Sequence, residues 1–355
     1  MLFQVLHVFF PFFYIQYILY YLILSTCYAI LQNEDVLKGE KIMQRAIISL
    51  DNIIKVKQLN RGDKLYHYTT IRGVKDILDS REFWATKSDY LNDKSEFRYI
   101  DEIITRVSMD KFRAPDFARY FAGAVSRELK SLLETSLDQN ELLHGYYVIS
   151  FSLLKNNSLL WTEYSGDIGY SIEFDYQELL DGISIHNAEL LQWHGSVIYD
   201  EAMQYDCVSE LLDLTLRQFF SDYTSYISDP SEISERALHL IVRYFSMMCI
   251  PYAMFFKNEC FSGEKEYRFI FDVYHEQNED ASIKNIDQLK FRHKDQRFIP
   301  FISVTFADYL SELPVDSILV GPKNDADLAV KGVQLYLRSL KSDIPVIKSD
   351  IPLRF

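Results

Sequence analysis

Three side chains with the chemistry of a catalytic site lie in separated segments of the chain: His67, Tyr164 and Glu266. Each lies where a strand-like run meets a loop or the start of a helix. An imidazole can hydrogen-bond a ligand hydroxyl, and an aromatic ring can stack on a flat heterocycle. A carboxylate can stabilise a positive charge that develops during a reaction. These residue types give the hypothesis of a site that holds a dinucleotide and stabilises a sugar cation.

The acidic member of this set has a neighbour of the same charge. Glu264 and Glu266 are two residues apart, just before a predicted strand. In an extended segment such residues point to the same face, and two carboxylates in one cleft need a compensating cation. Glycoside cleavage uses acidic pairs to stabilise an oxocarbenium-like centre. The alternative is a solvated loop in which Arg268 pairs with one of the two carboxylates.

The other candidates also have structural alternatives. His67 could be a core histidine bonded to a backbone carbonyl. Trp161 and Tyr164 are three residues apart and can share a helix face, so both could serve helix–sheet packing. Asn92, followed by Asp93, could simply cap a helix.

Composition and motifs disfavour several classes of protein. The 37 Lys and Arg against 51 Asp and Glu give a net charge of −14. This balance argues against non-specific nucleic-acid binding, although a small basic cleft on an acidic body stays open. The four Cys form no CxxC pair, and the eight His form no HxH or HxxxH pattern. The chain also lacks a GxSxG elbow and a P-loop.

Periodicity predicts strands scattered among helices, which indicates an α+β fold in one domain spanning residues 63–355. Helical insertions are expected at about 95–137 and 201–256. Strands are predicted within residues 64–68, 82–86, 146–151, 169–174, 196–199, 267–273, 298–304, 317–320 and 344–347, with short helices at 71–78 and 159–164 and a longer one at 325–340.

Residues 1–31 carry no charged side chain, followed by a connector over 32–62. The apolar run is long enough to cross a bilayer, which needs about 20 residues. In that interpretation Lys38, Lys41 and Arg45 place the domain in the cytoplasm, tethered to the inner membrane. The alternative is an over-extended start of the chain, with Met43 as the real initiator.

The motifs from residue 64 onward resemble a bacterial family known as domain of unknown function 2971. The resemblance spans residues 64–354. It rests on residues 65–69, 91–93 with Glu96, 149–152, Trp161, Tyr164, 256–257, Phe261, 264–268, 318–322 and 348–354.

The chain also resembles, more distantly, the ADP-ribosyltransferases with a His-Tyr-Glu signature. This resemblance implies a split, mostly antiparallel sheet and NAD as the substrate, with no metal. It implies that His67 binds a ribose hydroxyl, Tyr164 stacks on nicotinamide and Glu266 stabilises the sugar cation. The remaining residues expected to contact NAD are Thr69, Asn92, Ser152, Trp161, Glu264 and Arg268.

Two functions are therefore expected as alternatives. One is an NAD-dependent ADP-ribosyltransferase or NAD glycohydrolase whose protein or nucleic-acid acceptor the sequence does not reveal. The other is a non-enzymatic nucleotide-sensing or interaction module of a bacterial stress or phage-defence system.

Overall fold

The computed structural model describes residues 56–91, 96–133, 145–164, 169–220, 228, 233–273, 289–294, 296–309, 313–322 and 326–351. Asn92 and the apolar residues 1–31 lie outside these ranges. The site predicted at Asn92 and the predicted anchor therefore stay predictions.

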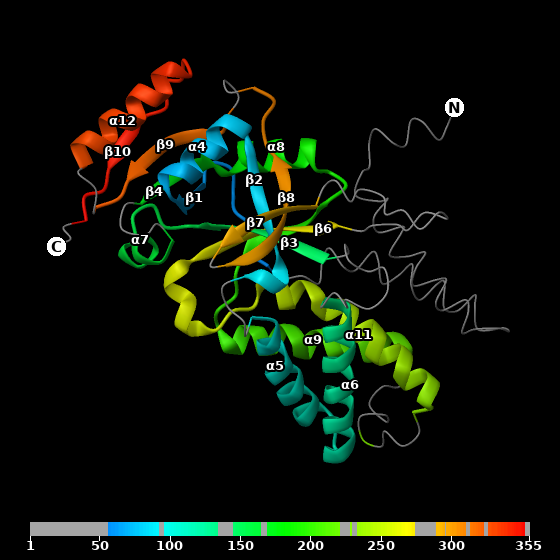
Figure 1. The fold of residues 1–355 in the computed structure, drawn as a ribbon. Helices are drawn as coiled ribbons and strands as arrows, with labels where there is room; N and C mark the ends of the chain where they lie inside the picture. The colour runs from blue at the N-terminus through cyan, green and yellow to red at the C-terminus, as the bar shows by residue number, and fades with distance from the viewer. Residues whose placement is uncertain are drawn as a thin grey trace, which may run out of the picture. The chain divides into compact units, whose positions relative to one another are not determined.

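The described residues form a mixed, mostly antiparallel sheet together with several helices, which confirms the α+β class (Figure 1). The only parallel pair among the described strands is β9 with β10. The strands are β1 (Lys64–Thr69), β2 (Glu82–Lys87), β3 (Gly145–Ser152), β4 (Tyr170–Asp175), β5 (Leu191–Ser196), β6 (Glu266–Val273), β7 (Leu289–Lys294), β8 (Arg297–Thr305), β9 (Val315–Val320) and β10 (Val346–Lys348).

Strand order places β3 at the centre of this sheet. The main path runs β10-β9-β4-β1-β3-β2-β8-β7, and β6 joins β3 to β5. The α-helices are α4 (Ile71–Ser80), α5 (Glu96–Lys111), α6 (Pro115–Leu133), α7 (Ser158–Tyr164), α8 (Tyr176–His186), α9 (Glu201–Phe219), α11 (Glu235–Phe255) and α12 (Ala326–Ser339), with short 3₁₀ turns at η1 (Ser88–Tyr90) and η3 (Glu259–Glu264).

One face of the sheet carries the main apolar core, and we call it the helix face. Phe83, Phe151, Phe174 and Phe269 lie on this face and are at most 3% exposed. Their alternation with polar residues along each strand is the pattern of a sheet with two different faces. Helices α4, α8 and α12 supply the residues that cover this core.

The opposite face, which we call the acid face, carries a row of polar residues in register. The cross-strand pairs are Ser317 with Glu173, Glu173 with Tyr66, Tyr66 with Ser152, and Ser152 with Glu266. Helix α7 packs on this face through Leu160 and Trp161, in a small cluster with Tyr66, Tyr68 and Leu319.

The strands β1 and β2 separate along one edge of β3. Strand β6 pairs with β3 along its whole length, so β1 and β2 share the other edge. Strand β1 meets β3 at Ser152, whereas β2 meets it at Tyr147 and Val148. The edge of β3 around Ser150 therefore lies in a gap between two diverging strands.

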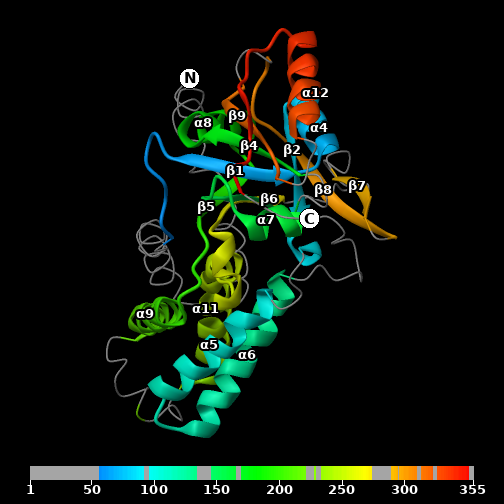
Figure 2. The same cartoon turned by 90° about the vertical axis from the view of Figure 1, so that its left-hand side faces the viewer.

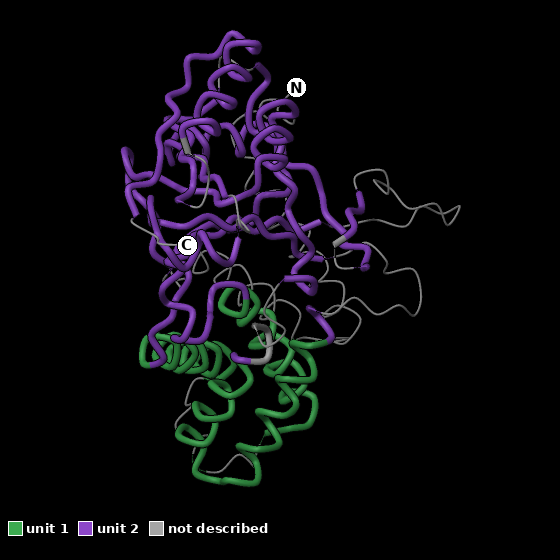
Figure 3. The backbone as a smooth tube through the Cα atoms, turned by 60° about the vertical axis from the view of Figure 1, so that its left-hand side comes forward, with its two compact units in different colours: residues 1–55, 100–130, 202–253 green, residues 56–99, 131–201, 254–355 purple. Residues whose placement is uncertain are grey.

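The chain divides into two compact units, shown in two colours in Figure 3. One unit comprises residues 56–99, 131–201 and 254–355, and contains the sheet. The other contains most of the two predicted insertions, at residues 100–130 and 202–253. Within it, ion pairs join Lys111 to Asp213 at 2.6 Å and Arg243 to Glu128 at 2.9 Å.

Helix α11 is long and apolar enough to cross a membrane, but 67% of its apolar window is buried inside the protein. Burial of this kind also occurs in the core helices of proteins that do not cross membranes. The helix therefore gives no evidence for a membrane span.

A buried and an exposed phenylalanine on the neighbouring strands β2 and β8 make opposite predictions for substitution. Phe83 on β2 is 2% exposed and contacts the rings of Phe151 at 5.3 Å and Phe174 at 5.4 Å. Phe83→Ala should lower the free energy of unfolding by about 3–5 kcal/mol in urea denaturation. The control Phe298→Ala, at a side chain that is 76% exposed, should change it by less than about 0.5 kcal/mol. Equal losses in the two variants would contradict the burial described above.

Candidate functional site

Four charged side chains meet at the start of β6, and we call them the ion cluster: Lys257, Glu264, Glu266 and Arg268. Each is between 1% and 7% exposed. Lys257 Nζ lies 2.6 Å from Glu264 Oε2 and 3.3 Å from Glu266 Oε2. Arg268 donates to both carboxylate oxygens of Glu266, from Nε at 2.9 Å and from Nη2 at 2.8 Å. Two cations and two anions thus balance within the cluster.

The chain path explains why both carboxylates reach one ammonium group. Glu264 ends the 3₁₀ turn η3, and Lys265 has φ of 46°, in the left-handed region. The two glutamates are therefore not the alternate residues of one extended segment, as their spacing had suggested. The turn is fixed by Ser152, whose Oγ donates to Glu264 O at 2.6 Å, and by Leu153, whose N–H donates to Lys265 O at 2.9 Å.

The pKa values of the two carboxyl groups shift in opposite directions. Burial raises the pKa of Glu264, and Glu266 adds to the rise while Lys257 opposes it. Burial would also raise the pKa of Glu266, but the charges of Arg268 and Lys257 outweigh it and hold the pKa below its ordinary value. Paired carboxyl groups with divergent pKa values are typical of sites that use one as an acid or base and the other as an anion.

Tyr164 joins this cluster from helix α7. Its hydroxyl donates to Glu264 Oε1 at 3.2 Å, and its side chain is 38% exposed. Burial of the phenol, followed by the charge of Glu264, raises the pKa of Tyr164, so the hydroxyl stays a donor. Tyr199, a residue that the sequence had not singled out, accepts from the backbone N–H of Glu266 at 3.0 Å.

His67 lies apart from this cluster, on the helix face. Its ring lies 5.4 Å from that of Phe83 and 5.5 Å from that of Phe151. The ring fills the gap between β1 and β2. Its Nδ1 lies 3.3 Å from Ser150 O, on a stretch of the β3 edge that neither strand pairs with, and can donate to that carbonyl. Burial lowers the pKa of His67 to about 4.

Two further predicted site residues, Trp161 and Thr69, have structural roles. Trp161 is 4% exposed, packs against Tyr68 at 4.7 Å and donates from Nε1 to Asn156 Oδ1 at 2.8 Å. Thr69 ends β1 beside Thr70, the N-cap of α4. The structure thus brings Tyr164, Ser152, Glu264, Glu266 and Arg268 together, while His67 and Thr69 lie elsewhere.

Lys257 is the member of the cluster that sequence reasoning missed. It formed part of a family motif, but nothing in its sequence surroundings marks a lysine that neutralises two acids seven and nine residues later. Its Nζ also lies 4.9 Å from the centre of the Phe261 ring. Among the described residues, no group of three or more His, Cys, Asp or Glu is placed to hold a metal ion.

A cavity of about 400 Å³ lies between α4 and α12, away from the ion cluster. Its lining is mainly apolar and includes Val74, Tyr170, Val333 and Tyr336. Lys75 also lines it but pairs with Asp79 on its own helix. Arg72 lines it as well and pairs with Asp76 on the same helix. Both cations of the lining are therefore paired within α4, away from Glu264 and Glu266.

Comparison with known proteins finds one family that matches part of the chain. Residues 160–269 match the family described as "Protein of unknown function (DUF2971)". The match supports the resemblance to this family over the segment that contains Tyr164 and the ion cluster. No curated protein and no solved structure matches the chain.

The position of His67 predicts a pH dependence of stability. Its folded-state pKa of about 4 lies below the ordinary 6.5, so the unfolded chain binds more protons between these values. The contribution of the neutral His67 to the free energy of unfolding is complete above pH 6.5 and is lost as the pH falls to 4. His67→Asn keeps a donor for Ser150 O but cannot titrate.

Urea denaturation at pH 7 and pH 4.5 measures this contribution. Between pH 7 and pH 4.5, the free energy of unfolding of His67→Asn should fall by about 1–3 kcal/mol less than that of the native protein. The control His293→Asn, at an exposed position, should leave the pH dependence unchanged. Identical pH profiles for the native protein and His67→Asn would contradict a partly buried imidazole that stays neutral in the folded state.

Proposed function

We propose that this protein breaks the glycosidic bond between nicotinamide and ribose in NAD, as an ADP-ribosyltransferase or an NAD glycohydrolase. The observation that carries the proposal is the hydrogen bond from Tyr164 to Glu264. It places a half-exposed aromatic ring from α7 beside an acidic pair whose pKa values diverge. This combination suits recognition of a flat heterocycle attached to a sugar.

In this proposal Tyr164 and Glu264 contact the substrate. Tyr164 stacks on the nicotinamide ring, and Glu264 accepts a hydrogen bond from a hydroxyl of the adjoining ribose. When the carbon–nitrogen bond breaks, its electron pair leaves with nicotinamide and the positive charge passes to the sugar carbon. The negative charge of the acidic pair stabilises that cation. Water or an acceptor nucleophile then adds to the carbon and loses a proton, for which Glu264 is the base.

Glu266 acts in this proposal through the rest of the ion cluster. Both of its oxygens are bound by Arg268, and Lys257 bridges it to Glu264. Glu266 therefore holds Lys257 in place and keeps Glu264 oriented. This role differs from the direct contact with the sugar that the His-Tyr-Glu resemblance implies. In this proposal His67 takes no part in the reaction, because it lies on the opposite face of the sheet.

Release of nicotinamide from NAD by the full chain tests the proposal. Glu264→Gln keeps the shape of the side chain but removes its charge, so the rate should fall by about 100-fold or more. The matched control is Glu163→Gln, an exposed neighbour on α7, which should keep the native rate. An unchanged rate in Glu264→Gln would exclude this mechanism.

A non-enzymatic nucleotide-sensing module is the second candidate. It is favoured by the complete pairing of Glu266 with Arg268 and Lys257 inside a buried cluster, an arrangement that is typical of structural ion networks. In this candidate Tyr164 and Glu264 bind the nucleotide and no bond is broken.

Thermal unfolding with and without NAD separates the two candidates. For a sensor, NAD at 100 times its Kd should stabilise the fold by about 2.7 kcal/mol without any nicotinamide appearing. Tyr164→Phe should weaken this stabilisation, since it removes the hydrogen bond that orients Glu264. Nicotinamide release by the native protein would eliminate the sensor, and the absence of both release and stabilisation would eliminate NAD as the ligand.

A further inference from the structure

A second group of side chains on the acid face lies over β2, β8 and β7, away from the ion cluster. Trp84 is opposite Ser303, and Thr86 and Lys290 are both opposite Phe301. Because side chains alternate along a strand, Trp84, Lys290, Arg292 and Arg297 share this face. We call these four residues the cationic patch.

Trp84 provides an aromatic surface within the cationic patch. Trp84 is 39% exposed although it lies within β2. It stacks on Phe301 with ring centres 4.6 Å apart and an angle of 27°, and Phe301 itself is only 4% exposed. The buried phenylalanine thus fixes the orientation of an indole whose remaining surface faces solvent. A base can stack on such a ring.

Lys290 places a positive charge beside this ring. Its Nζ donates to Ser303 Oγ at 2.8 Å, and Ser303 is the direct cross-strand neighbour of Trp84. The ammonium group is therefore held near the indole although the side chain is exposed.

Arg292 is a partly buried cation of the cationic patch that lacks a counter-charge within the described part of the chain. It is partly buried, and one of its guanidinium nitrogens, Nη2, donates to Thr86 Oγ1 at 2.8 Å. Its Nε is buried without a hydrogen-bond partner, and Arg292 forms no ion pair within the described part of the chain. Burial lowers its pKa, as expected for a cation that lacks a counter-charge. A phosphate beside the guanidinium group would supply the missing counter-charge.

The charge of this region is opposite to that of the whole chain. The sequences of β2, β7 and β8 contain one acidic residue, Glu82, whereas the chain carries a net charge of −14. Figure 2 shows the β7–β8 hairpin extending outward from the rest of the sheet. A locally basic, projecting strand pair can track a phosphate backbone that the acidic remainder of the protein repels.

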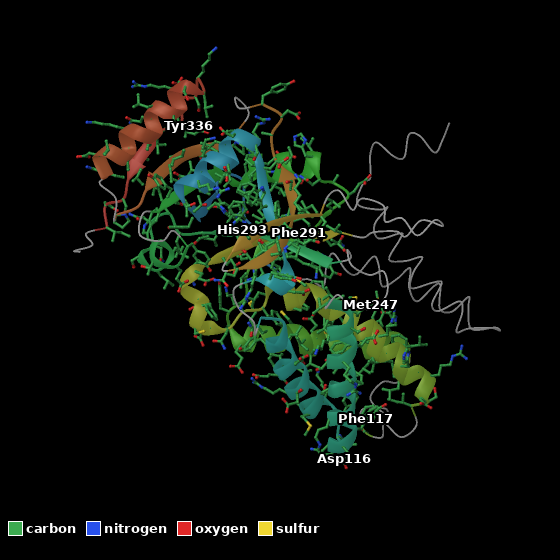
Figure 4. The ribbon with its side chains drawn as sticks, in the orientation of Figure 1. Asp116, Phe117, Met247, Phe291, His293 and Tyr336 are labelled. Carbon is green, nitrogen blue, oxygen red and sulfur yellow. The ribbon has the colours of Figure 1, made fainter. Side chains whose placement is uncertain are left out.

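We propose that the cationic patch binds single-stranded nucleic acid, with a base stacked on Trp84 and the neighbouring phosphates on Lys290, Arg292 and Arg297. The combination of a fixed exposed indole with three cations on one sheet face matches the way sequence-tolerant single-strand binders work. Phe291 and His293, labelled in Figure 4, belong to the helix-face side of the same hairpin and take no part. The inference does not depend on the reaction proposed at Glu264.

Fluorescence anisotropy of a labelled twelve-residue oligothymidine, titrated with the full chain, tests the proposal. Trp84→Ala should weaken binding about 10-fold or more through loss of stacking. Arg292→Gln should weaken binding at 50 mM salt and reduce its salt dependence, because one phosphate contact is lost. With three phosphate contacts, affinity should fall about 20-fold between 50 and 200 mM salt.

Control variants and ligands make the outcome specific. Phe291→Ser and Phe298→Ser on the opposite side of the hairpin, and Lys75→Gln on α4, should leave oligothymidine binding unchanged. A duplex of the same length should bind more weakly, because its bases cannot stack on Trp84. The proposal is overturned if oligothymidine fails to bind at 50 mM salt, or if binding is insensitive to Trp84→Ala and Arg292→Gln. It is also overturned if only NAD or anionic lipid vesicles bind this face.

Discussion

The compensation of charge inside the ion cluster is the constraint on which the site depends. Burying a carboxylate or an ammonium group costs several kcal/mol unless a partner with good geometry balances it. Lys257 and Arg268 provide that balance for Glu264 and Glu266, with no member more than 7% exposed. Removing one member would leave a buried charge that has lost at least one of its partners. The cluster therefore acts as one unit, and it fixes where β6 begins, beside β3 and β5.

This unit determines what the surrounding residues can do. Glu266 is held from two sides, whereas Glu264 keeps one oxygen for Tyr164 and for a ligand. His67 has a different role. It fills the gap between the diverging strands β1 and β2, beside Ser150. Tyr164 and Glu266 thus belong to the site on the acid face, whereas His67 packs on the helix face of the same sheet. The chemistry proposed here belongs to the acid face alone.

Most of the fold could be predicted from the sequence, because alternation and helical periodicity are local properties. The strands predicted within 64–68, 82–86 and 146–151 correspond to β1, β2 and β3, and the helix at 71–78 corresponds to α4. The strand expected at 196–199 was misplaced, since β5 occupies Leu191–Ser196 and Ile198 forms only an isolated bridge with Phe256. Gly195 and His194 weaken the apolar alternation there. Strand β7 and helix α8 were not predicted.

The site was less predictable, because it depends on register and on charge pairs distant in sequence. The Tyr164–Glu264 contact joins residues 100 positions apart, and the face on which His67 lies follows from its pairing with Ile172. The left-handed conformation of Lys265 has no marker such as glycine. The cationic patch was not predictable either, because Thr86 on β2 and Arg292 on the β7–β8 hairpin are 206 residues apart. The net charge of −14 also gave no sign of a local basic surface.

Lys257 couples Glu264 and Glu266 into one unit, and the rest of the site depends on this coupling. A double-mutant cycle of Lys257→Met and Glu264→Gln, measured by urea denaturation, tests this directly. We expect each single variant to be strongly destabilised and the pair to be coupled by about 0.5–3 kcal/mol. Effects that add within about 0.3–0.5 kcal/mol would mean that the two side chains act independently, and would contradict the account.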